Sequence, residues 1–418
     1  MDRPQFDNSA FDLVAREVRP LSDAFAAAGY QIYLVGGIVR DLIARRQRGA
    51  PDIDLTTDAT PEEIERLLAG RTDAVWKQGA RFGTIGCRIG RRVFEITTHR
   101  SEAYLSESRK PIVTFSRRVE DDLSRRDFTV NSMALSLPDG KLIDPFGGRD
   151  DLESHFLRTP LAPAVSLSDD PLRMLRAARF VAGYALAPDA EIETAISALR
   201  DRLAIVSRER IRDELDKLLA VPDPVPGFAL LQRTALLDEF IPELSRVDAA
   251  AFDLVRAVDG IERRRAALFA SITDRSMIAA RARALKYSAV EVDNIGAMLS
   301  AVDALAALDS VDPPNVRRWV RAAGPVLDDA IALAEAMHIA AIPDVRKLLD
   351  QLGRTEDLRV LEPELDGDEV QRVLGIHQGR DVGAALTFLL GLRLDEGVLG
   401  PDEARRRLRE WWAQQNNP

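Results

Sequence analysis

The stretch of residues 31–57, QIYLVGGIVRDLIARRQRGAPDIDLTT, sets the expectations for the rest of this chain. It begins with an apolar run typical of a β-strand, residues 32–35, which leads through Gly36 and Gly37 into a helix-like segment that carries Arg40. A glycine turn lets backbone N–H groups approach a phosphate closely. The pattern therefore predicts a phosphate-binding turn, although a diglycine after a strand is by itself most often only a tight turn.

The end of the same stretch is strand-like and presents Asp52 and Asp54. Residues two apart on a strand point to the same face, so two carboxylates would lie about 7 Å apart along the chain. Adjacent carboxylates repel each other unless a positive group lies between them, and a hard divalent cation such as Mg²⁺ suits oxygen ligands. An Asp-X-Asp alone is usually a solvated strand or loop edge. Next to the diglycine turn it predicts a site for a metal ion and a triphosphate.

Length and composition limit the class of protein. At 418 residues, the chain suggests about two to four domains, and 46% hydrophobic with 30% charged residues is typical of a folded globular protein. The sequence has no apolar run of membrane-spanning length and no signal-peptide core, so we expect a cytoplasmic protein with no membrane association. The single cysteine, Cys87, excludes an internal disulfide partner and a cysteine-based zinc cluster.

The charge distribution restricts nucleic-acid contacts. The net charge is −10, and basic and acidic residues balance over the first 150 positions, so the acidic excess lies in the remainder. This argues against broad non-specific binding of nucleic acid, and any RNA contact must come from local patches. None of the four histidines is followed by Asp, so a His-Asp phosphohydrolase module has no support.

The residues after the Asp pair predict a mixed α/β layer. Thr60, Pro61 and Glu63 are typical of a helix start with a capping box. Strand-like runs follow at residues 74–77, 83–89 and 91–98. The last run carries Glu95, which is either a third carboxylate of the site or a strand-face residue paired with a nearby arginine.

A polar motif follows at residues 121–131, DDLSRRDFTVN. An arginine beside a triphosphate, here Arg126, supplies charge-assisted bidentate hydrogen bonds. Asp127 and Asn131 can take ribose hydroxyl groups. A helix cap with a flanking ion pair would explain Asp127 alone, but not the whole motif.

A further charged segment, SDDPLRMLRAARF, occupies residues 168–180. Pro171 suits the first turn of a helix, and Asp170, Arg173 and Arg176 are three apart and would line one helical face. Arginine donors and aspartate acceptors together can match the edge of a base. The alternative is a surface helix with ion pairs between neighbouring turns.

Together these motifs resemble the signature of the nucleotidyltransferase superfamily, in particular its class II tRNA nucleotidyltransferase and bacterial poly(A) polymerase branch. The resemblance rests on LVGGIVRD and DIDL, on RRDFTVN against the family's Arg-Arg-Asp-Phe-Thr-Ile-Asn, and on the family's Glu-Asp-X-X-Arg motif. Asp169 stands where that last motif has Glu, which keeps the charge but shortens the side chain. The likeness is specific over residues 31–215 and looser beyond.

The resemblance implies roles for individual residues. Asp52 and Asp54 would hold two Mg²⁺ ions, and Glu95 would be a third catalytic carboxylate. Asp170 and Arg173 would act as a protein template that recognises the Watson–Crick edge of CTP or ATP. The implied nucleotide-binding residues are Gly36, Gly37, Arg40, Arg126, Asp127, Asn131, Asp169, Asp170, Arg173, Arg176 and Arg179.

The resemblance also implies an α+β fold with a mixed-sheet, polymerase-beta-like nucleotidyltransferase head followed by an all-helical neck, body and tail. We expect the head at residues 1–140, the base-recognising neck at 141–215, the body at 216–330 and a tRNA-binding tail at 331–418. The implied reaction adds C, C and A from CTP and ATP to the tRNA 3′ end without a nucleic-acid template.

Three alternatives stay open at this point. A poly(A) polymerase of the same branch usually carries a strongly basic C-terminal extension, whereas this C-terminal half is acidic. An enzyme that adds only CC or only A is the second. In the family a flexible loop near residues 101–119 is needed for the switch to A, although composition alone suggests a solvated surface loop there. The third is a non-catalytic RNA-binding protein, which would have no need of Asp52, Asp54 and Arg126.

Overall fold

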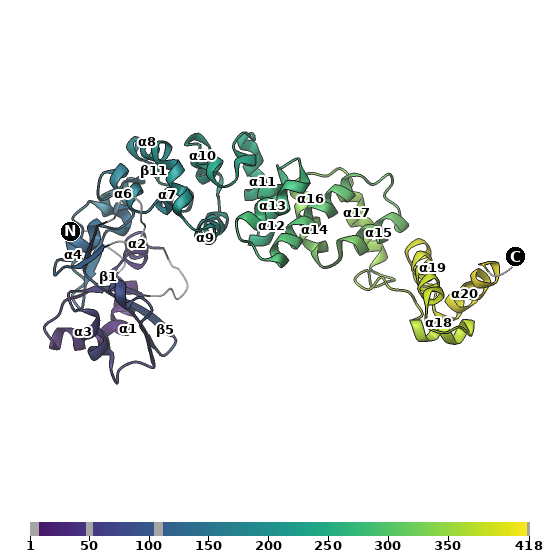
Figure 1. Ribbon diagram of the computed structural model, residues 1–418, viewed down its shortest axis with the longest axis horizontal. Helices are drawn as coiled ribbons and strands as arrows, with labels where there is room; N and C mark the ends of the chain where they lie inside the picture. The colour runs from purple at the N-terminus through teal and green to yellow at the C-terminus, as the bar shows by residue number, and fades with distance from the viewer. Residues whose placement is uncertain (1–7, 47–52, 104–111, 416–418) are drawn as a thin grey trace. The chain divides into compact units, whose positions relative to one another are not determined.

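The computed structural model describes residues 8–46, 53–103 and 112–415, so Asp52 and residues 104–111 lie outside the described residues (Figure 1). The chain divides into two compact units, Met1–Arg246 and Val247–Pro418. The predicted four-part division into head, neck, body and tail stays a prediction within this two-unit framework.

A seven-stranded sheet organises the head, with strand order β3-β4-β5-β2-β1-β8-β9. Strands β2 and β5 pair in parallel, and the other neighbours pair antiparallel. The predicted mixed sheet is therefore confirmed, and it extends slightly beyond the expected end of the head at residue 140. The strands are β1 (Ile32–Val35), β2 (Ile53–Thr57), β3 (Ala74–Trp76), β4 (Thr84–Ile89), β5 (Arg92–Thr98), β8 (Ala134–Ser136) and β9 (Leu142–Ile143).

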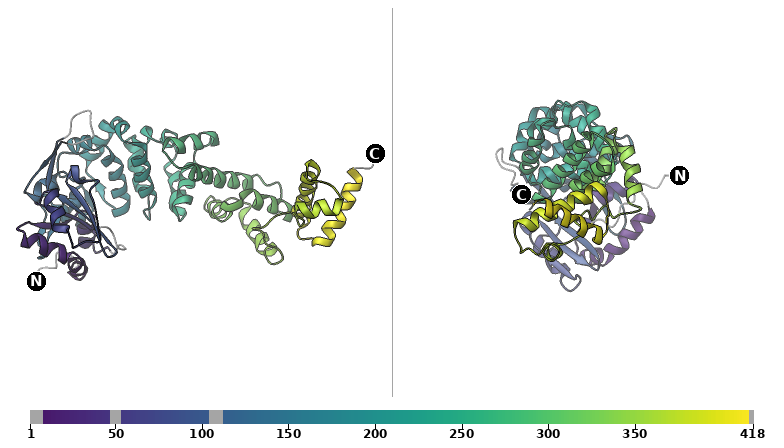
Figure 2. Two further views of the ribbon diagram at one scale, coloured as in Figure 1. Left: turned by 60° about the horizontal axis from the view of Figure 1, so that its bottom comes forward. Right: turned by 90° about the vertical axis from the view of Figure 1, so that its right-hand side faces the viewer.

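Helices α1 (Asn8–Ala27) and α3 (Pro61–Leu68) cover one face of this sheet, as the purple helices of Figures 1 and 2 show. The start of α3 is the predicted capping box, with the Thr60 side chain accepting from the Glu63 N–H and the Glu63 carboxylate accepting from the Thr60 N–H. α1 runs through Pro20 without a break. The apolar core under these helices includes Phe25, Leu34, Leu55, Ile64 and Phe94.

The opposite face of the sheet is covered only in part. Helix α4 (Val119–Ser124) packs Val119 and Leu123 against Tyr33 and Val35 of β1. Because side chains alternate along a strand, Asp54 of β2 and Glu95 of β5, each between two buried residues, point to this same face, and both are exposed. This leaves an uncovered strip of sheet beside α4.

Short strands β6 (Arg100–Ala103) and β7 (Ile112–Phe115) form a separate antiparallel pair. The expectation of a solvated loop over residues 101–119 is therefore wrong at its two ends, because backbone hydrogen bonds join them in a ladder. Residues 104–111 between these strands lie outside the described part of the chain.

The rest of the first unit is helical except for a two-residue parallel pair, β10 (Phe156–Leu157) with β11 (Ala187–Pro188). The expectation of an all-helical neck is wrong at this point, because the Ala187 N–H and the Asp189 N–H donate to His155 and Leu157 carbonyls. The helices of this unit are α2 (Gly37–Ile43), α5 (Gly148–Glu153), α6 (Pro163–Asp169), α7 (Leu172–Tyr184), α8 (Ala190–Leu199), α9 (Arg208–Leu219) and α10 (Val225–Arg233).

The described part of the second unit is built from helices, and its last three pack around a small core that includes Leu365, Leu389 and Leu408. A buried ion triad, Arg317–Glu356–Arg393, joins helix α15 (Pro313–Ala323) to helix α19 (Arg380–Glu396) within this unit. No described helix is long and apolar enough to cross a membrane. The helices are α11 (Asp253–Ala257), α12 (Ile261–Ala270), α13 (Arg275–Ala284), α14 (Ala289–Ala306), α15 (Pro313–Ala323), α16 (Leu327–Ala336), α17 (Ile342–Leu352), α18 (Gly367–Leu374), α19 (Arg380–Glu396) and α20 (Pro401–Gln415).

Candidate active site

The uncovered strip of the sheet brings two predicted carboxylates together. Asp54 on β2 pairs directly with Glu95 on the parallel strand β5, and both residues are exposed. Paired positions on neighbouring strands place their side chains on the same face. The Glu95 side chain makes no hydrogen bond or ion pair with the described residues, which leaves the alternative of a strand-face ion pair without support in that part of the chain.

The donor chemistry of this strip suits a hard divalent cation. Two carboxylates on one sheet face supply only oxygen ligands, and Mg²⁺ is bound in proteins through one or two carboxylates plus phosphate oxygens. The described residues contain no group of three or more His, Cys, Asp or Glu side chains arranged to hold a metal. Asp52, which the sequence spacing predicts on the same face, lies outside the described residues.

A cavity of about 250 Å³, the glycine cavity, adjoins Asp54. At Gly36 the backbone has a φ of 73°, and an added Cβ would lie 3.0 Å from Arg126 Nη1 and 3.5 Å from Asp54 Oδ2. The left-handed backbone at this turn favours glycine, and a Cβ here would be crowded by Arg126 but only in ordinary contact with Asp54. The cavity is lined by Gly36, Gly37, Arg40, Asp54, Arg126, Asp127, Asn131, Arg176, Arg179 and Phe180.

A buried hydrogen-bond network links the motifs around the glycine cavity. Arg40 Nη1 donates to Asn131 Oδ1 at 2.5 Å, and Asn131 Nδ2 donates to Asp127 Oδ1 at 2.8 Å. Arg176 Nη2 donates to the other oxygen, Asp127 Oδ2, at 2.5 Å. Through Asp127, the network holds Arg40, Asn131 and Arg176 together, although these residues come from three different segments of the sequence.

Asp127 is the anionic centre of that network. Burial alone would raise the pKa of its carboxyl, but the Arg176 guanidinium and the hydrogen bond from Asn131 hold that pKa well below its usual range. Asp127 is therefore ionised at neutral pH and forms an ion pair with Arg176. Asp127 and Asn131 both have hydrogen-bond partners within the protein. Their predicted contacts to the ribose would therefore be made in addition to these bonds.

Asp122, which the sequence did not single out, holds two arginines of the same motif. Its side chain is fully buried, and its oxygens lie 2.8 Å from Arg125 Nη2 and 3.1 Å from Arg126 Nη2. Burial opposes ionisation, but both guanidinium groups lower the pKa of Asp122. Arg126 Nε is buried and has no hydrogen-bond partner among the described residues. Arg126 therefore keeps one donor without an acceptor among the described residues, and the residue lines the glycine cavity.

A second cavity, of about 650 Å³, contains Glu95 and the predicted template residues. We call it the tryptophan cavity. Its sheet side comes from β3, β4 and β5, and Asp170 and Arg173 come from the junction of α6 and α7. The lining residues are Trp76, Gln78, Gly79, Phe82, Thr84, Gly86, Glu95, Arg100, Arg125, Asp170 and Arg173.

Asp170 and Arg173, the predicted template residues, do not lie on one helix. The prediction that they share a helical face is therefore wrong for Asp170. α6 ends at Asp169, α7 begins at Leu172, and Asp170 between them is extended with φ −134° and ψ 98°. The following proline disfavours the helical region for the residue before it. Asp170 nevertheless lies in the same cavity as Arg173.

Both template side chains are held by protein contacts. Arg173 is 8% exposed, and its Nη1 donates to Ser166 Oγ at 2.7 Å while Nη2 donates to the Arg125 carbonyl at 2.5 Å. Asp170 Oδ2 accepts from Arg210 Nη2 at 3.2 Å. The alternative of a direct surface ion pair between Asp170 and Arg173 is therefore not what the structure has.

The remaining predicted residues differ in their positions. Arg176 and Arg179 line the glycine cavity, and Glu214 of α9 accepts from Arg179 Nε. Glu214, whose carboxylate lies near Arg176 as well as Arg179, was not singled out from the sequence, because both partners are at least 35 positions away. Asp169 is half-buried at the end of α6 and lines neither cavity.

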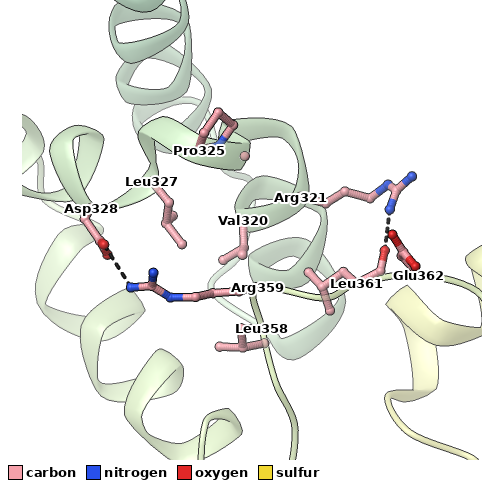
Figure 3. Close-up of a pocket in the computed structure, with 10 residues that line it drawn as sticks. Val320, Arg321, Pro325, Leu327, Asp328, Leu358, Arg359, Leu361 and Glu362 are labelled. Carbon is pink, nitrogen blue, oxygen red and sulfur yellow. Dashed lines mark hydrogen bonds and ion pairs between the residues drawn. The ribbon is translucent and has the colours of Figure 1, made fainter.

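A cavity of about 540 Å³ in the second unit has a different character (Figure 3). Its two guanidinium groups are engaged by protein acceptors: Arg359 pairs with Asp328 at 2.9 Å, and Arg321 donates to the Leu361 carbonyl. Unlike the cavities of the head, it has no carboxylate strip beside a glycine turn among its lining residues. Paired carboxylates beside a glycine turn are therefore a feature of the head cavities and not of this lining.

Two family models match this chain. The Poly A polymerase head domain matches residues 32–158, and the model described as Probable RNA and SrmB- binding site of polymerase A matches residues 186–247. The first match contains the carboxylate strip and both glycines of the turn. The second covers α8, α9 and α10.

Similar proteins extend this result. The CCA-adding enzyme of Geobacillus kaustophilus is 35% identical over 299 residues, which are 70% of this chain and 69% of that protein. The CCA-adding enzyme of Bacillus subtilis is 39% identical over 223 residues, 53% of this chain and 54% of that protein.

Solved structures are similar over nearly the whole chain. A Bacillus stearothermophilus CCA-adding enzyme in complex with CTP has a TM-score of 0.78 at 26% identity, covering 97% of this chain and 98% of that one. A Thermotoga maritima CCA-adding enzyme complexed with tRNA has a TM-score of 0.71 at 19% identity, which shows the fold alone. The motifs, the mixed-sheet head and these similarities agree: the chain belongs to the CCA-adding enzymes, a family of tRNA nucleotidyltransferases.

Proposed function

We propose that this protein adds C, C and A, one nucleotide at a time, to the 3′ end of tRNA, using CTP and ATP and no nucleic-acid template. One observation carries the proposal. The carboxylates of Asp54 and Glu95 are paired on one sheet face, with an arginine-lined cavity beside the first and a cavity containing Asp170 and Arg173 beside the second. A nucleoside triphosphate has phosphates and a base to fill two such cavities.

In the proposed reaction the 3′-hydroxyl group of the RNA loses its proton to solvent, and its oxygen bonds to the α-phosphorus of the triphosphate. The bond from that phosphorus to the β-phosphate oxygen breaks, and pyrophosphate leaves. Arg126, Arg176 and Arg179 bind the negative phosphates, and the turn at Gly36 and Gly37 lets backbone N–H groups approach them. Arg126 donates to Asp122 through Nη2, but its Nε has no acceptor among the described residues, which supports a role for this arginine in binding a new anion.

We further propose that Asp52 and Asp54 bind two Mg²⁺ ions and that Glu95 lies beside these ions. Bound Mg²⁺ would make the attacking hydroxyl more acidic and offset charge on the leaving pyrophosphate. Asp54 and Glu95 contribute oxygen ligands at paired positions, which supports a divalent cation of this kind. The identity of the metal is part of the proposal. So is metal binding by Asp52, which lies outside the described residues.

Base choice is proposed to come from Asp170 and Arg173. A guanidinium donates and a carboxylate accepts, so together they can match the edges of cytosine and adenine. Arg173 is held in place by Ser166 and by the Arg125 carbonyl, which pre-orients its donors. We assign Asp169 a supporting place at most in base recognition, since it lines neither cavity.

The proposal is tested with tRNA that ends before CCA, incubated with each triphosphate in turn and then with CTP and ATP together. We expect CTP alone to add two residues, and ATP to add one residue only after them. Addition that stops after CC, or that needs CC already present, would favour a partial enzyme. Equal extension of single-stranded oligoadenylate by ATP would favour a poly(A) polymerase.

A protein that binds tRNA without incorporating any nucleotide would leave only the non-catalytic alternative. A cytoplasmic location and a tRNA-binding role for residues 331–418 stay predictions, to be tested by cell fractionation and by crosslinking to tRNA.

A further inference from the structure

Trp76 on strand β3 has an unusual position for a large aromatic residue. It pairs with Gly86 on β4, and an added Cβ at Gly86 would lie 1.9 Å from Trp76 Nε1. The indole therefore lies directly over the Gly86 backbone, where any other residue would displace it. Gly86 in turn pairs with Glu95, which pairs with Asp54. Trp76 thus extends along the sheet toward the two carboxylates.

The indole has no packing role that would explain this placement. Trp76 is half-buried and does not belong to either of the described clusters around Leu34 and Tyr33, and its indole N–H has no hydrogen-bond partner in the part of the chain that the structure describes. Buried or half-buried indole N–H groups usually find a partner. Trp76 and Phe82 instead present aromatic rings to the tryptophan cavity.

The size of the tryptophan cavity leaves room for more than the base of the incoming triphosphate. Its volume of about 650 Å³ lies inside the range of roughly 300–1,000 Å³ that accommodates a drug-sized ligand. Asp170 and Arg173 supply donors and acceptors, whereas Trp76 and Phe82 supply rings. The cavity therefore has one part suited to hydrogen bonding a base edge and another suited to stacking a base face.

We propose that Trp76 is the stacking platform for the 3′-terminal base of the RNA, and so a positioning residue for its hydroxyl. This inference rests on the proposed function, in which the RNA end changes after every addition. Stacking tolerates such change because every base has a π-face, whereas hydrogen-bond recognition of one base would reject the next end. Because Gly86 has no side chain, the Trp76 indole can lie over its backbone and so close to Glu95.

The test compares Trp76→Ala, Trp76→Phe and Val75→Ala in steady-state addition to tRNA that lacks CCA. Val75 is the matched control, because it is 38% exposed on the same strand and its side chain points to the other face. Loss of one stacked base predicts an RNA KM about 5- to 150-fold higher for Trp76→Ala, with the CTP KM unchanged. Trp76→Phe restores most of the affinity, and Val75→Ala matches the wild type.

A second readout reports stacking directly. With 2-aminopurine as the 3′-terminal base of the tRNA, fluorescence should be quenched on binding to the wild type and to Trp76→Phe. It should stay bright with Trp76→Ala at tRNA concentrations that saturate this variant. Equal quenching by Trp76→Ala, or a raised CTP KM with an unchanged RNA KM, would overturn the inference. If the wild type itself adds no nucleotide, the proposed function fails, but the binding and quenching comparison still tests the platform.

Discussion

Asp54 and Glu95 occupy directly paired positions on the parallel strands β2 and β5, with both side chains on the uncovered face of the sheet. The neighbouring pairs, Ile53 with Phe94 and Leu55 with Ile96, are buried on the other face. A single register of the sheet thus builds the core on one side and a pair of carboxylates on the other. A one-residue slip would exchange the two faces.

Glu95→Gln tests whether the second carboxylate of that pair takes part in metal binding. We expect kcat to fall about 10- to 100-fold, with a higher Mg²⁺ concentration needed for half-maximal activity, because an oxygen ligand or its close support loses its charge. Steady-state rates over a Mg²⁺ titration measure this. A Mg²⁺ dependence identical to that of the wild type would mean that Glu95 is only a strand-face carboxylate.

Arg173→Ala tests the protein template. Each good bidentate contact to a base is worth roughly 1–3 kcal/mol of discrimination, so selection of CTP and ATP over UTP and GTP should weaken by about 5- to 150-fold. Incorporation of all four triphosphates is measured. Ser166→Ala removes the hydroxyl that accepts from Arg173 at 2.7 Å but keeps the guanidinium, so it should weaken selection less than Arg173→Ala does. Unchanged selection in Arg173→Ala would remove the template role from this residue.

The local features of this fold could be predicted from sequence, and the long-range pairings could not. The capping box of α3 depends on Thr60 and Glu63, which are neighbours on one turn, so the pattern was sufficient. Asp127 and Arg176 meet across 49 positions, and only the packed helices bring them together. The motif indicated that both residues belong to the site, but not that each is the other's partner.

Asp170 and Trp76 illustrate two further limits. Spacing alone placed Asp170 on the helix of Arg173, whereas the proline after it keeps it extended. Trp76 carried no signal, because a lone aromatic residue on an edge strand is common. Its meaning comes from its pairing with Gly86, which requires the sheet register.

Asp127→Asn should change the acid response of the head. The folded-state pKa of Asp127 is lowered, so its ionised form stabilises the protein above the unfolded pKa of about 3.9, and that contribution is lost as pH falls through the folded value. The variant should melt at a lower temperature than the wild type at pH 7. The difference in melting temperature between the variant and the wild type should narrow below about pH 4. Asp23→Asn, which alters an exposed pair with Arg19, should show little gap at either pH.

Glu356→Gln tests the ion triad of the second unit. The Glu356 side chain is 3% exposed between Arg317 and Arg393, which are 7% and 5% exposed. Removing its charge leaves two buried guanidinium groups without an anion, so we expect a loss of about 3–5 kcal/mol in the free energy of unfolding. Asp395→Asn, in an exposed pair with Arg318, should cost less than about 1 kcal/mol. Equal effects of the two changes in thermal melting would contradict a structural role for the triad.

The most direct test of the account is the activity of Asp54→Ala on tRNA that lacks CCA, with Mg²⁺, CTP and ATP present. Asp54 is exposed at the rim of the glycine cavity, so the variant should keep the melting temperature of the wild type and still bind tRNA. We predict that its incorporation of both nucleotides falls by more than about 100-fold, since a direct metal ligand should matter more than the outer partners that cost 10–100-fold. Normal incorporation by a folded Asp54→Ala protein would contradict nucleotidyl transfer at this sheet face.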